Sequence, residues 1–445
     1  MLNFQFNHKI FFGFFLIIFP LWGQGRPTLR GCQSRFSLNQ CIEYAYKQNF
    51  DVKLRELKFR QSENTLEQSQ KARYPSVSGS FSQGINSGRS IDPFTNGFIQ
   101  RTISSNSFGT NANLILFNGF SLKNQILQNQ YNTEADQIDI QRAKNDLRTR
   151  VTLAFMQVLM NQELAKIAQE QIQNIQSHSE RVRALVNEGN MPKTNLIDLD
   201  AQLATADFDA INAKNNIELA KLSLAQLMAY PNFTNFEIEN NIDEKAMILP
   251  EDYLQNTLLS IDNQPVMRNI KLRLQSAKIG IKLAEAGKYP SVSLGAGLGS
   301  AYSSAASKEY NYFNQLGFNL NQFARLSVSI PIYTNGQVRG RITNAEINQR
   351  IVETQLSQTK LQLKQEIEQA YLATKIAQEK HKSAQKQVSA QQIAYDSAKK
   401  RYLEGLLHTV EVNTFRINLE KAKSNLIQSK YEFYFRKIVL DFYAK

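Results

Sequence analysis

The stretch Arg73-Tyr74-Pro75-Ser76-Val77-Ser78-Gly79-Ser80-Phe81 lies near the start of this chain of 445 residues. A near copy, Lys288-Tyr289-Pro290-Ser291-Val292-Ser293-Leu294-Gly295, lies past its middle. In both places a proline ends a helix-like segment, because proline lacks an N–H and restricts the residue before it. A strand-like segment follows in each case. The doubled phrase therefore suggests that one structural unit occurs twice.

Two more pairs of landmarks keep nearly the same separation, about 216 residues, which is the mark of an internal repeat. Phe117-Asn118-Gly119 matches Tyr333-Thr334-Asn335-Gly336, and Glu188-Gly189 matches Glu404-Gly405. The order of segments is also the same around each landmark. The sequence therefore predicts two internal repeats.

Apolar and small polar residues alternate after each Tyr-Pro. The mainly apolar set, at every second position, comprises Val77, Gly79, Phe81, Ile85, Leu114, Leu116, Val292, Leu294, Ala296, Leu298, Leu326, Val328, Ile330 and Ile332. The small or polar set, at the positions between them, comprises Ser76, Ser78, Ser80, Ser82, Gly84, Asn111, Asn113, Ser291, Ser293, Gly295, Gly297, Gly299, Arg325, Ser327 and Ser329. A period of two predicts strands with unlike faces, and about ten residues per strand suits a tilted membrane-spanning strand. We expect strand hairpins over about 76–117 and 291–333.

Long helical patterns follow each hairpin, over about 120–188 and 337–404, and shorter ones return over about 193–228 and 409–443. Apolar residues recur at heptad-like spacing along the first of them, as at Leu147, Val151, Ala154 and Val158. At about 1.5 Å per residue, a helix of this length is a rod about 100 Å long. Such rods are far longer than the helices of ordinary globular domains.

These patterns divide the chain into four parts. Residues 1–25 hold one charged residue, Lys9, followed by a short apolar run and small residues, which predicts a secretory signal peptide. Residues 26–229 form the first repeat, 230–265 a small mixed region, and 266–445 the second repeat. The two cysteines, Cys32 and Cys41, leave both a disulfide and lipidation open.

The net charge of +13 raises the question of nucleic acid, but basic and acidic residues are interleaved along the helices. A solvated helical surface explains them, so we expect no nucleic-acid partner. The four histidines have no metal-ligand spacing. Gly295-Ala296-Gly297-Leu298-Gly299 only partly matches a dinucleotide fingerprint, and no helix follows it. We therefore expect no enzyme, no catalytic, cofactor or metal site, and no cofactor.

Four strands cannot close a barrel, and an open edge in lipid leaves backbone groups unsatisfied at several kcal/mol each. Three chains would supply twelve strands around one lumen. The predicted fold is mostly α with transmembrane β. It is a trimeric 12-stranded β-barrel with four strands per chain, continued outside the membrane by a long α-helical barrel.

The chain resembles the TolC-like outer-membrane efflux proteins over about residues 37–443. The resemblance rests on Ser37-Leu38-Asn39-Gln40-Cys41-Ile42-Glu43-Tyr44-Ala45, the two Tyr-Pro-Ser strand entries and the two Glu-Gly turns. It implies a homotrimer in the outer membrane, in contact with its lipid, with a long periplasmic tunnel. It also implies a periplasmic adaptor (membrane-fusion) protein and, through it, an inner-membrane pump.

The resemblance also assigns adaptor-contact tips to the helical turns. These are Glu188, Gly189, Asn190, Glu404, Gly405 and Leu406. The family often has Val before the glycine, whereas this chain has Glu in both turns. Each glycine also has a purely structural explanation, since a helix C-terminus favours a residue with positive φ.

A closed gate at the same end is the second feature that the resemblance implies. Its expected residues are Tyr402, Glu411, Thr414, Thr194 and Asn195. A Tyr402–Asn195 hydrogen bond is expected, while Leu407 stands where some members have a basic partner. Glu411 either joins an acidic ring that favours cations or is a solvated residue favoured by the helix dipole; both remain open.

The sequence thus favours an outer-membrane channel component of a tripartite efflux or secretion system, a passive exit duct coupled to an adaptor and a pump. The alternative is a soluble periplasmic coiled-coil scaffold without a channel, which would leave the four alternating strands without a use. Drug, metal and protein export are not separated by these residues.

Overall fold

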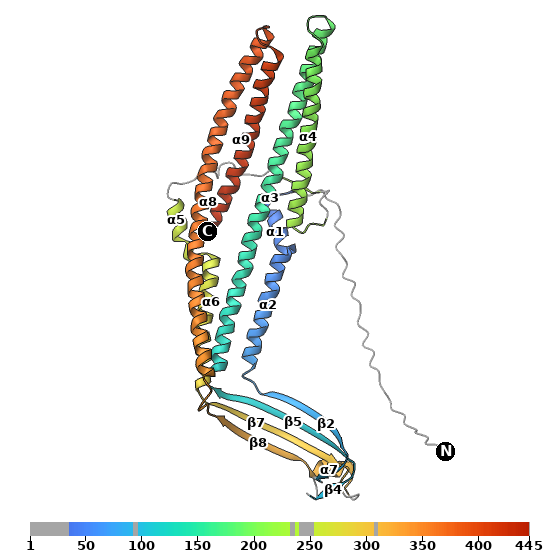
Figure 1. The fold of residues 1–445 in the computed structure, drawn as a ribbon, viewed down its shortest axis with the longest axis vertical. Helices are drawn as coiled ribbons and strands as arrows, with labels where there is room; N and C mark the ends of the chain where they lie inside the picture. Colours follow the sequence, from blue (N-terminus) through green and yellow to red (C-terminus); the bar gives the residue numbers. More distant parts are fainter. Residues whose placement is uncertain (1–34, 92–96, 232–235, 240–252, 307–309, 445) are drawn as a thin grey trace, which may run out of the picture.

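The computed structural model describes residues 35–91, 97–231, 236–239, 253–306 and 310–444. The expected signal peptide, Cys32 and part of the expected mixed region lie outside the described residues. Figure 1 shows an elongated molecule with a β-sheet at one end and two pairs of helices that extend to the other end.

Two helices of 67 residues each form the long axis, α3 (Ser121–Asn187) and α8 (Gln337–Leu403). Each corresponds to a rod of about 100 Å. They carry no interior proline. At the start of α3, the Asn118 side chain accepts a hydrogen bond from the Leu122 N–H (3.2 Å). Among the described residues, none of the helices combines the length and the apolar composition that crossing a lipid bilayer requires.

Each long helix has partner helices along both halves of its length (Figure 1). Toward the end remote from the sheet, α4 (Thr194–Leu227) packs on α3 and α9 (Thr409–Ala444) packs on α8. Toward the sheet, α2 (Phe50–Lys71) packs on α3, and α6 (Pro265–Glu285) packs on both α3 and α8. Helix α6 thereby joins the two halves of the chain.

Near the middle of the rods, α2 meets α4 and α6 meets α9, in each case through one amide side chain. Asn49 caps α2 by accepting from the Asp51 N–H (2.9 Å) and donates to the Leu227 carbonyl at the end of α4 (2.9 Å). Gln264, which precedes α6, donates to the Tyr443 carbonyl near the end of α9 (2.9 Å). Each amide satisfies a carbonyl that a helix end leaves without an intrahelical partner.

The main hydrophobic core lies at this same level. Helix α1 (Leu38–Gln48), which begins with a Ser37 capping box, packs its buried face against α3. Two short strands, β1 (Arg35–Phe36) and β6 (Glu237–Ile238), pair in parallel beside it. The largest fully buried members of this core are Phe155, Phe236, Leu147, Leu159, Leu224 and Met228. A smaller core forms where η3 (Ile261–Asn263) meets α6 and α8, next to α5 (Tyr253–Leu259).

Four antiparallel strands form the sheet, in the order β2-β5-β7-β8. They are β2 (Ser76–Asn86), β5 (Ile103–Asn118), β7 (Ser291–Ser303) and β8 (Asn321–Ser329). Pairing of β5 with β7 joins the two halves of the chain in one sheet. At the sheet end farthest from the helices, β3 (Arg89–Ile91) pairs with β4 (Phe98–Gln100), and α7 (Tyr312–Phe318) contacts β7.

The register gives the sheet two unlike faces, as the alternation predicts. On the apolar face, Val77 is opposite Ala112, Leu294 is opposite Leu326, and Val292 is opposite Val328. On the polar face, Ser78 is opposite Asn111 and Ser293 is opposite Ser327. The apolar side chains are exposed in the single chain; Phe81 keeps 61% of its surface and Leu326 62%.

Three details differ from the expected strands. Strand β8 ends at Ser329, so Ile330 and Ile332 lie outside it; Pro331 has no N–H to donate to the ladder. Strand β5 has 16 residues rather than about ten. Leu116 has no partner on β7, because the register shifts between Ile115 and Phe117, as in a β-bulge. The sheet face of Leu116 therefore does not follow from the alternation of residues along the strand.

The polar face also holds an unexpected aromatic residue. Phe323 is opposite Gly297, and a Cβ at Gly297 would lie 2.5 Å from its Cε1 atom. The ring therefore occupies the space that the missing side chain leaves, an arrangement that pins strand register.

The turns from sheet to long helix require left-handed backbone at Gly119 (φ +61°) and Gly336 (φ +75°). A Cβ at Gly119 would lie 2.5 Å from the Ala286 carbonyl oxygen, whereas a Cβ at Gly336 would have no atom within 4 Å. The first turn therefore has no room for a side chain at its glycine.

We expect Gly119→Ala to lower the thermal midpoint of the detergent-solubilised protein clearly more than Gly336→Ala. Alanine at position 336 costs only the energy of adopting a positive φ, about 1–2 kcal/mol. Equal shifts from the two variants would contradict the close approach at Gly119.

Candidate functional site

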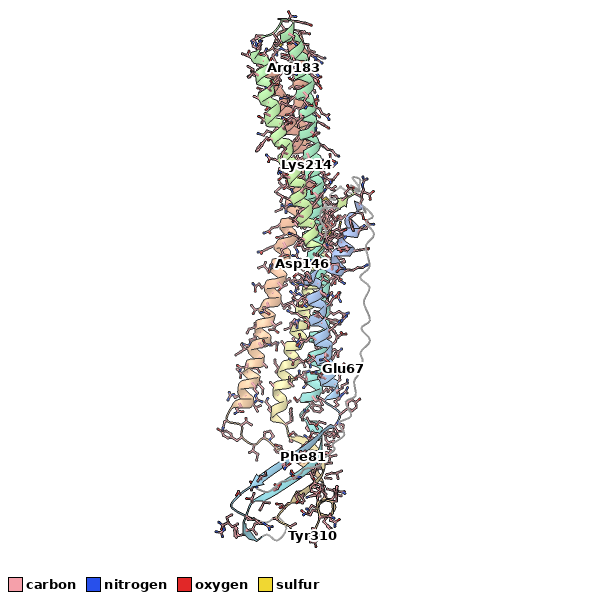
Figure 2. All side chains as sticks on the ribbon, turned by 90° about the vertical axis from the view of Figure 1, so that its right-hand side faces the viewer. Glu67, Phe81, Asp146, Arg183, Lys214 and Tyr310 are labelled. Atoms are coloured by element: carbon pink, nitrogen blue, oxygen red, sulfur yellow. The ribbon has the colours of Figure 1, made fainter. Side chains whose placement is uncertain are left out.

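The two expected tips lie at the end of the molecule remote from the sheet (Figure 2, where Arg183 marks the end of α3). Each long helix ends in a Schellman motif. The N–H of Asn190 bonds the Leu185 carbonyl (2.9 Å) and the N–H of Gly189 bonds the Val186 carbonyl (3.1 Å). The second turn repeats this pattern through Leu406 and Gly405.

Positive φ is the structural reason for both glycines, +76° at Gly189 and +77° at Gly405. A Cβ at either position would have no atom within 4 Å, so backbone strain alone, and not crowding, selects glycine. The structural explanation of the glycines is therefore correct, and it leaves the neighbouring side chains available for contact.

Those neighbouring side chains point to solvent. Glu188 and Glu404 are exposed, and Leu406 keeps 67% of its surface. Glu188 accepts a hydrogen bond from the Asn190 amide (3.2 Å), which orders the first tip. The second turn therefore presents an apolar side chain beside a carboxylate, whereas the first presents a carboxylate and an amide.

The expected gate residues on α9 make local contacts in the single chain. Glu411 accepts a hydrogen bond from the backbone N–H of His408 (3.0 Å), so it satisfies a free donor at the start of α9. Thr414 donates to the Val410 carbonyl one turn earlier (3.0 Å). Thr194 is exposed in the first turn of α4, and Asn195, next to it, is half-buried.

The expected Tyr402–Asn195 hydrogen bond is wrong for this structure. The Tyr402 hydroxyl is buried and has no hydrogen-bond partner among the described residues. Its ring instead packs edge-on against His178 of α3, with ring centroids 5.6 Å apart. The Tyr402 ring thus bridges α8 and α3.

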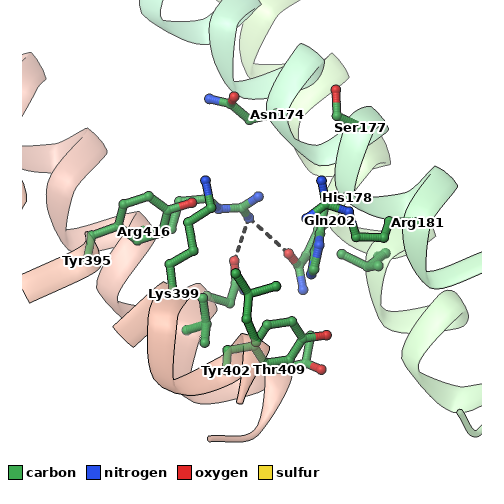
Figure 3. Close-up of a pocket in the computed structure, with 14 residues that line it drawn as sticks. Asn174, Ser177, His178, Arg181, Gln202, Tyr395, Lys399, Tyr402, Thr409 and Arg416 are labelled. Atoms are coloured by element: carbon green, nitrogen blue, oxygen red, sulfur yellow. Dashed lines mark hydrogen bonds between the residues drawn. The ribbon is translucent and has the colours of Figure 1, made fainter. Parts of the chain in front are cut away.

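A residue that the sequence analysis did not single out joins the two helix pairs. Arg416 of α9 is 9% exposed, and its Nη2 donates to the Gln202 Oε1 of α4 (2.9 Å) and to Asn413 (Figure 3). Its Nε lies 3.9 Å from the Glu420 carboxylate and has no hydrogen bond among the described residues. The sequence held a sign of this buried charge, because Arg416 lies at helical spacing between the apolar residues Val412 and Leu419.

A pocket of about 150 Å³ opens beside Arg416 and takes side chains from all four helices. Its polar lining residues include His178 and Arg181 of α3, Gln202 of α4, and Lys399 of α8 (Figure 3). Burial lowers the pKa of His178, and the charges of Arg416, Arg181 and Lys399 lower it further. His178 is therefore neutral at pH 7 in a region of positive potential.

Cys41 has no reactive role in this arrangement. It is fully buried in the main core and forms no disulfide with a described residue, and burial raises the pKa of its thiol to about 12. Its relation to Cys32 is not described by the structure. Within the described ranges, no three His, Cys, Asp or Glu side chains gather in a way that would hold a metal ion.

Solved outer-membrane channels share this fold. The chain is similar to the channel protein CusC, with a TM-score of 0.77, 19% identity, and coverage of 92% of this chain and 91% of that chain. It is also 20% identical over 398 residues to the outer membrane efflux protein BepC of Brucella suis, covering 89% of this chain and 82% of BepC. Outer membrane protein TolC of Escherichia coli is 23% identical over 308 residues, covering 66% of this chain and 60% of TolC.

The family model described as outer membrane efflux protein matches residues 41–229 and 259–441. The chain therefore belongs to the outer membrane efflux protein family. It is a TolC-like efflux channel protein of the outer membrane, as its sequence predicts. The alternative of a soluble periplasmic scaffold is not supported.

His178 provides a prediction on pH. Because its pKa is lowered in the folded protein, the unfolded chain binds a proton more readily, so stability falls as pH falls through about 6.5. We expect His178→Gln to lose less thermal stability than the wild type between about pH 7.5 and pH 5.5. Thermal midpoints in detergent measure this. His408→Gln, which removes an exposed imidazole, is the matched control; an equally shallow pH response in that variant would contradict the assignment.

Proposed function

We propose that three copies of this chain form one channel, in which twelve strands close a β-barrel and the helices continue it as a periplasmic tunnel. The observation that carries the proposal is the four-stranded sheet, which has unpaired edges at β2 and β8 and one exposed apolar face. In lipid an unpaired edge is too costly, and pairing β8 of one copy with β2 of the next removes every edge. The apolar face then contacts lipid and the Ser/Gly/Asn face lines the lumen.

The helices support the same assembly. Exposed apolar residues run in a stripe along one side of α4, at Ile197, Phe208, Ile211 and Leu219, and α2 continues the edge with Leu54 and Leu57. A second stripe runs along α8, with Ile347, Ile351, Leu361, Leu372 and Ile376. In Figure 1, α8 lies at one lateral edge of the molecule and α2 and α4 at the other. Contact between unlike edges closes into a ring when the rotation between copies allows it.

We further propose that the duct is passive and works with a periplasmic adaptor and, through it, an inner-membrane pump. Both tips lie at the far end from the sheet, and their exposed Glu188, Glu404 and Leu406 side chains are the proposed adaptor contacts. The proposed gate remains at the same end, with Tyr402, Glu411, Thr414, Thr194 and Asn195. In a trimer, three Glu411 carboxylates near the axis would favour cations. Exported compounds are not specified by these residues.

The native mass of the protein extracted in mild detergent tests the assembly. We expect a detergent-dependent particle of three chains, because only shared strands satisfy both sheet edges. A monomer or dimer that stays soluble without detergent would overturn the proposed barrel.

Gly405→Pro tests the proposed tip. Proline cannot adopt the φ of +77°, and it removes the N–H that bonds the Tyr402 carbonyl. We expect export to fall strongly while the amount and native mass in the outer membrane stay unchanged, and Gly405→Ala to have a smaller effect. Accumulation of exported dyes in cells that depend on this channel measures it. Normal export by the proline variant would exclude a functional role for this tip.

A further inference from the structure

We propose that the pocket beside Arg416 binds a small oxyanion such as sulfate, phosphate or a carboxylate, and that the bound anion links the two helix pairs. Three cationic side chains line this pocket, Arg181, Lys399 and Arg416, and no carboxylate does. Nothing in the channel activity itself requires such a site.

The charge around the pocket is only partly balanced. Glu420, the nearest carboxylate to Arg416, lies 3.9 Å from its Nε, and burial raises the pKa of Glu420 against the lowering effect of Arg416. The lowered pKa of His178 has Arg416, Arg181 and Lys399 among its causes, so the charges of all three residues act at one place. An anion would lower the energy of this cluster.

Two buried polar groups at the pocket also lack a hydrogen-bond partner among the described residues. They are the Nε of Arg416, a residue that keeps 9% of its surface, and the hydroxyl of Tyr402. Buried polar groups are normally hydrogen-bonded, and an ion is one explanation when they are not. A guanidinium and a hydroxyl are donors that suit oxyanion oxygens.

The size of the pocket fits this class of ligand. A volume of about 150 Å³ has room for a small oxyanion. Sites for drug-sized molecules are larger, at about 300 Å³ or more.

The pocket takes residues from α3, α4, α8 and α9, so its ligand would contact both helix pairs. Separation of the pairs would break up the site and release the anion. Anion binding and the contact between the two helix pairs would therefore stabilise each other by linkage.

Sulfate on the full, detergent-solubilised protein tests the site, since it stays a dianion across the pH range in which His178 titrates. We expect sulfate to raise the His178 pKa, observed by NMR of labelled histidine, by more than chloride does at equal ionic strength. The signal is assigned by its loss in His178→Gln. We expect sulfate affinity to be weaker by about tenfold or more in Arg416→Gln, because a charge-assisted donor is lost.

Two further variants complete the test. Arg181→Gln removes a lining charge without touching the Arg416–Gln202 bond and should also weaken sulfate binding. Arg183→Gln removes a neighbouring exposed charge that does not line the pocket and should leave binding unchanged. An equal response to sulfate and chloride in the wild type would overturn the site. So would sulfate affinity that is the same in the wild type, Arg416→Gln and Arg181→Gln.

Discussion

The pairing of β5 with β7 is the interaction on which the rest of this structure depends. It hydrogen-bonds the first half of the chain to the second half, over a register that runs from Ser105 opposite Ser303 to Asn118 opposite Ser291. Because β5 leads into α3, the pairing fixes where one long helix starts, and the turn after β8 fixes the other. Both rods then leave the same end of the sheet, and α6 lies between them.

Near their tips, α3 and α4 pack through small and aliphatic residues such as Ala206, Ile172 and Ile175. At Arg416 this packing gives way to a buried guanidinium with one bond across to Gln202. A buried charge is weak evidence for stability. Separation of the helix pairs would remove the bond to Gln202 and leave Arg416 only its contacts with Asn413 and Glu420 of α9 itself.

Much of this fold could be predicted from sequence because it depends on local features. The long helices run where proline is absent and apolar residues keep their period, and they end where Gly189 and Gly405 supply positive φ. The strand faces follow from alternation alone. The features that were missed depend on residues distant in the chain. The register shift at Leu116 is set by the partner strand, and the place of Phe323 by Gly297 across the sheet. The contact of Tyr402 with His178 likewise joins two helices far apart in the sequence.

The two amide side chains at mid-height have a mechanical consequence. Helices α3 and α8 are continuous there, whereas their partners are each made of two helices that meet end to end at Asn49 and at Gln264. A continuous backbone resists bending through its whole hydrogen-bond ladder, but each junction resists it through a side-chain bond and local packing. Bending and torsion of the rods should therefore concentrate at this level, so the half beyond it can twist while the half beside the sheet keeps its shape.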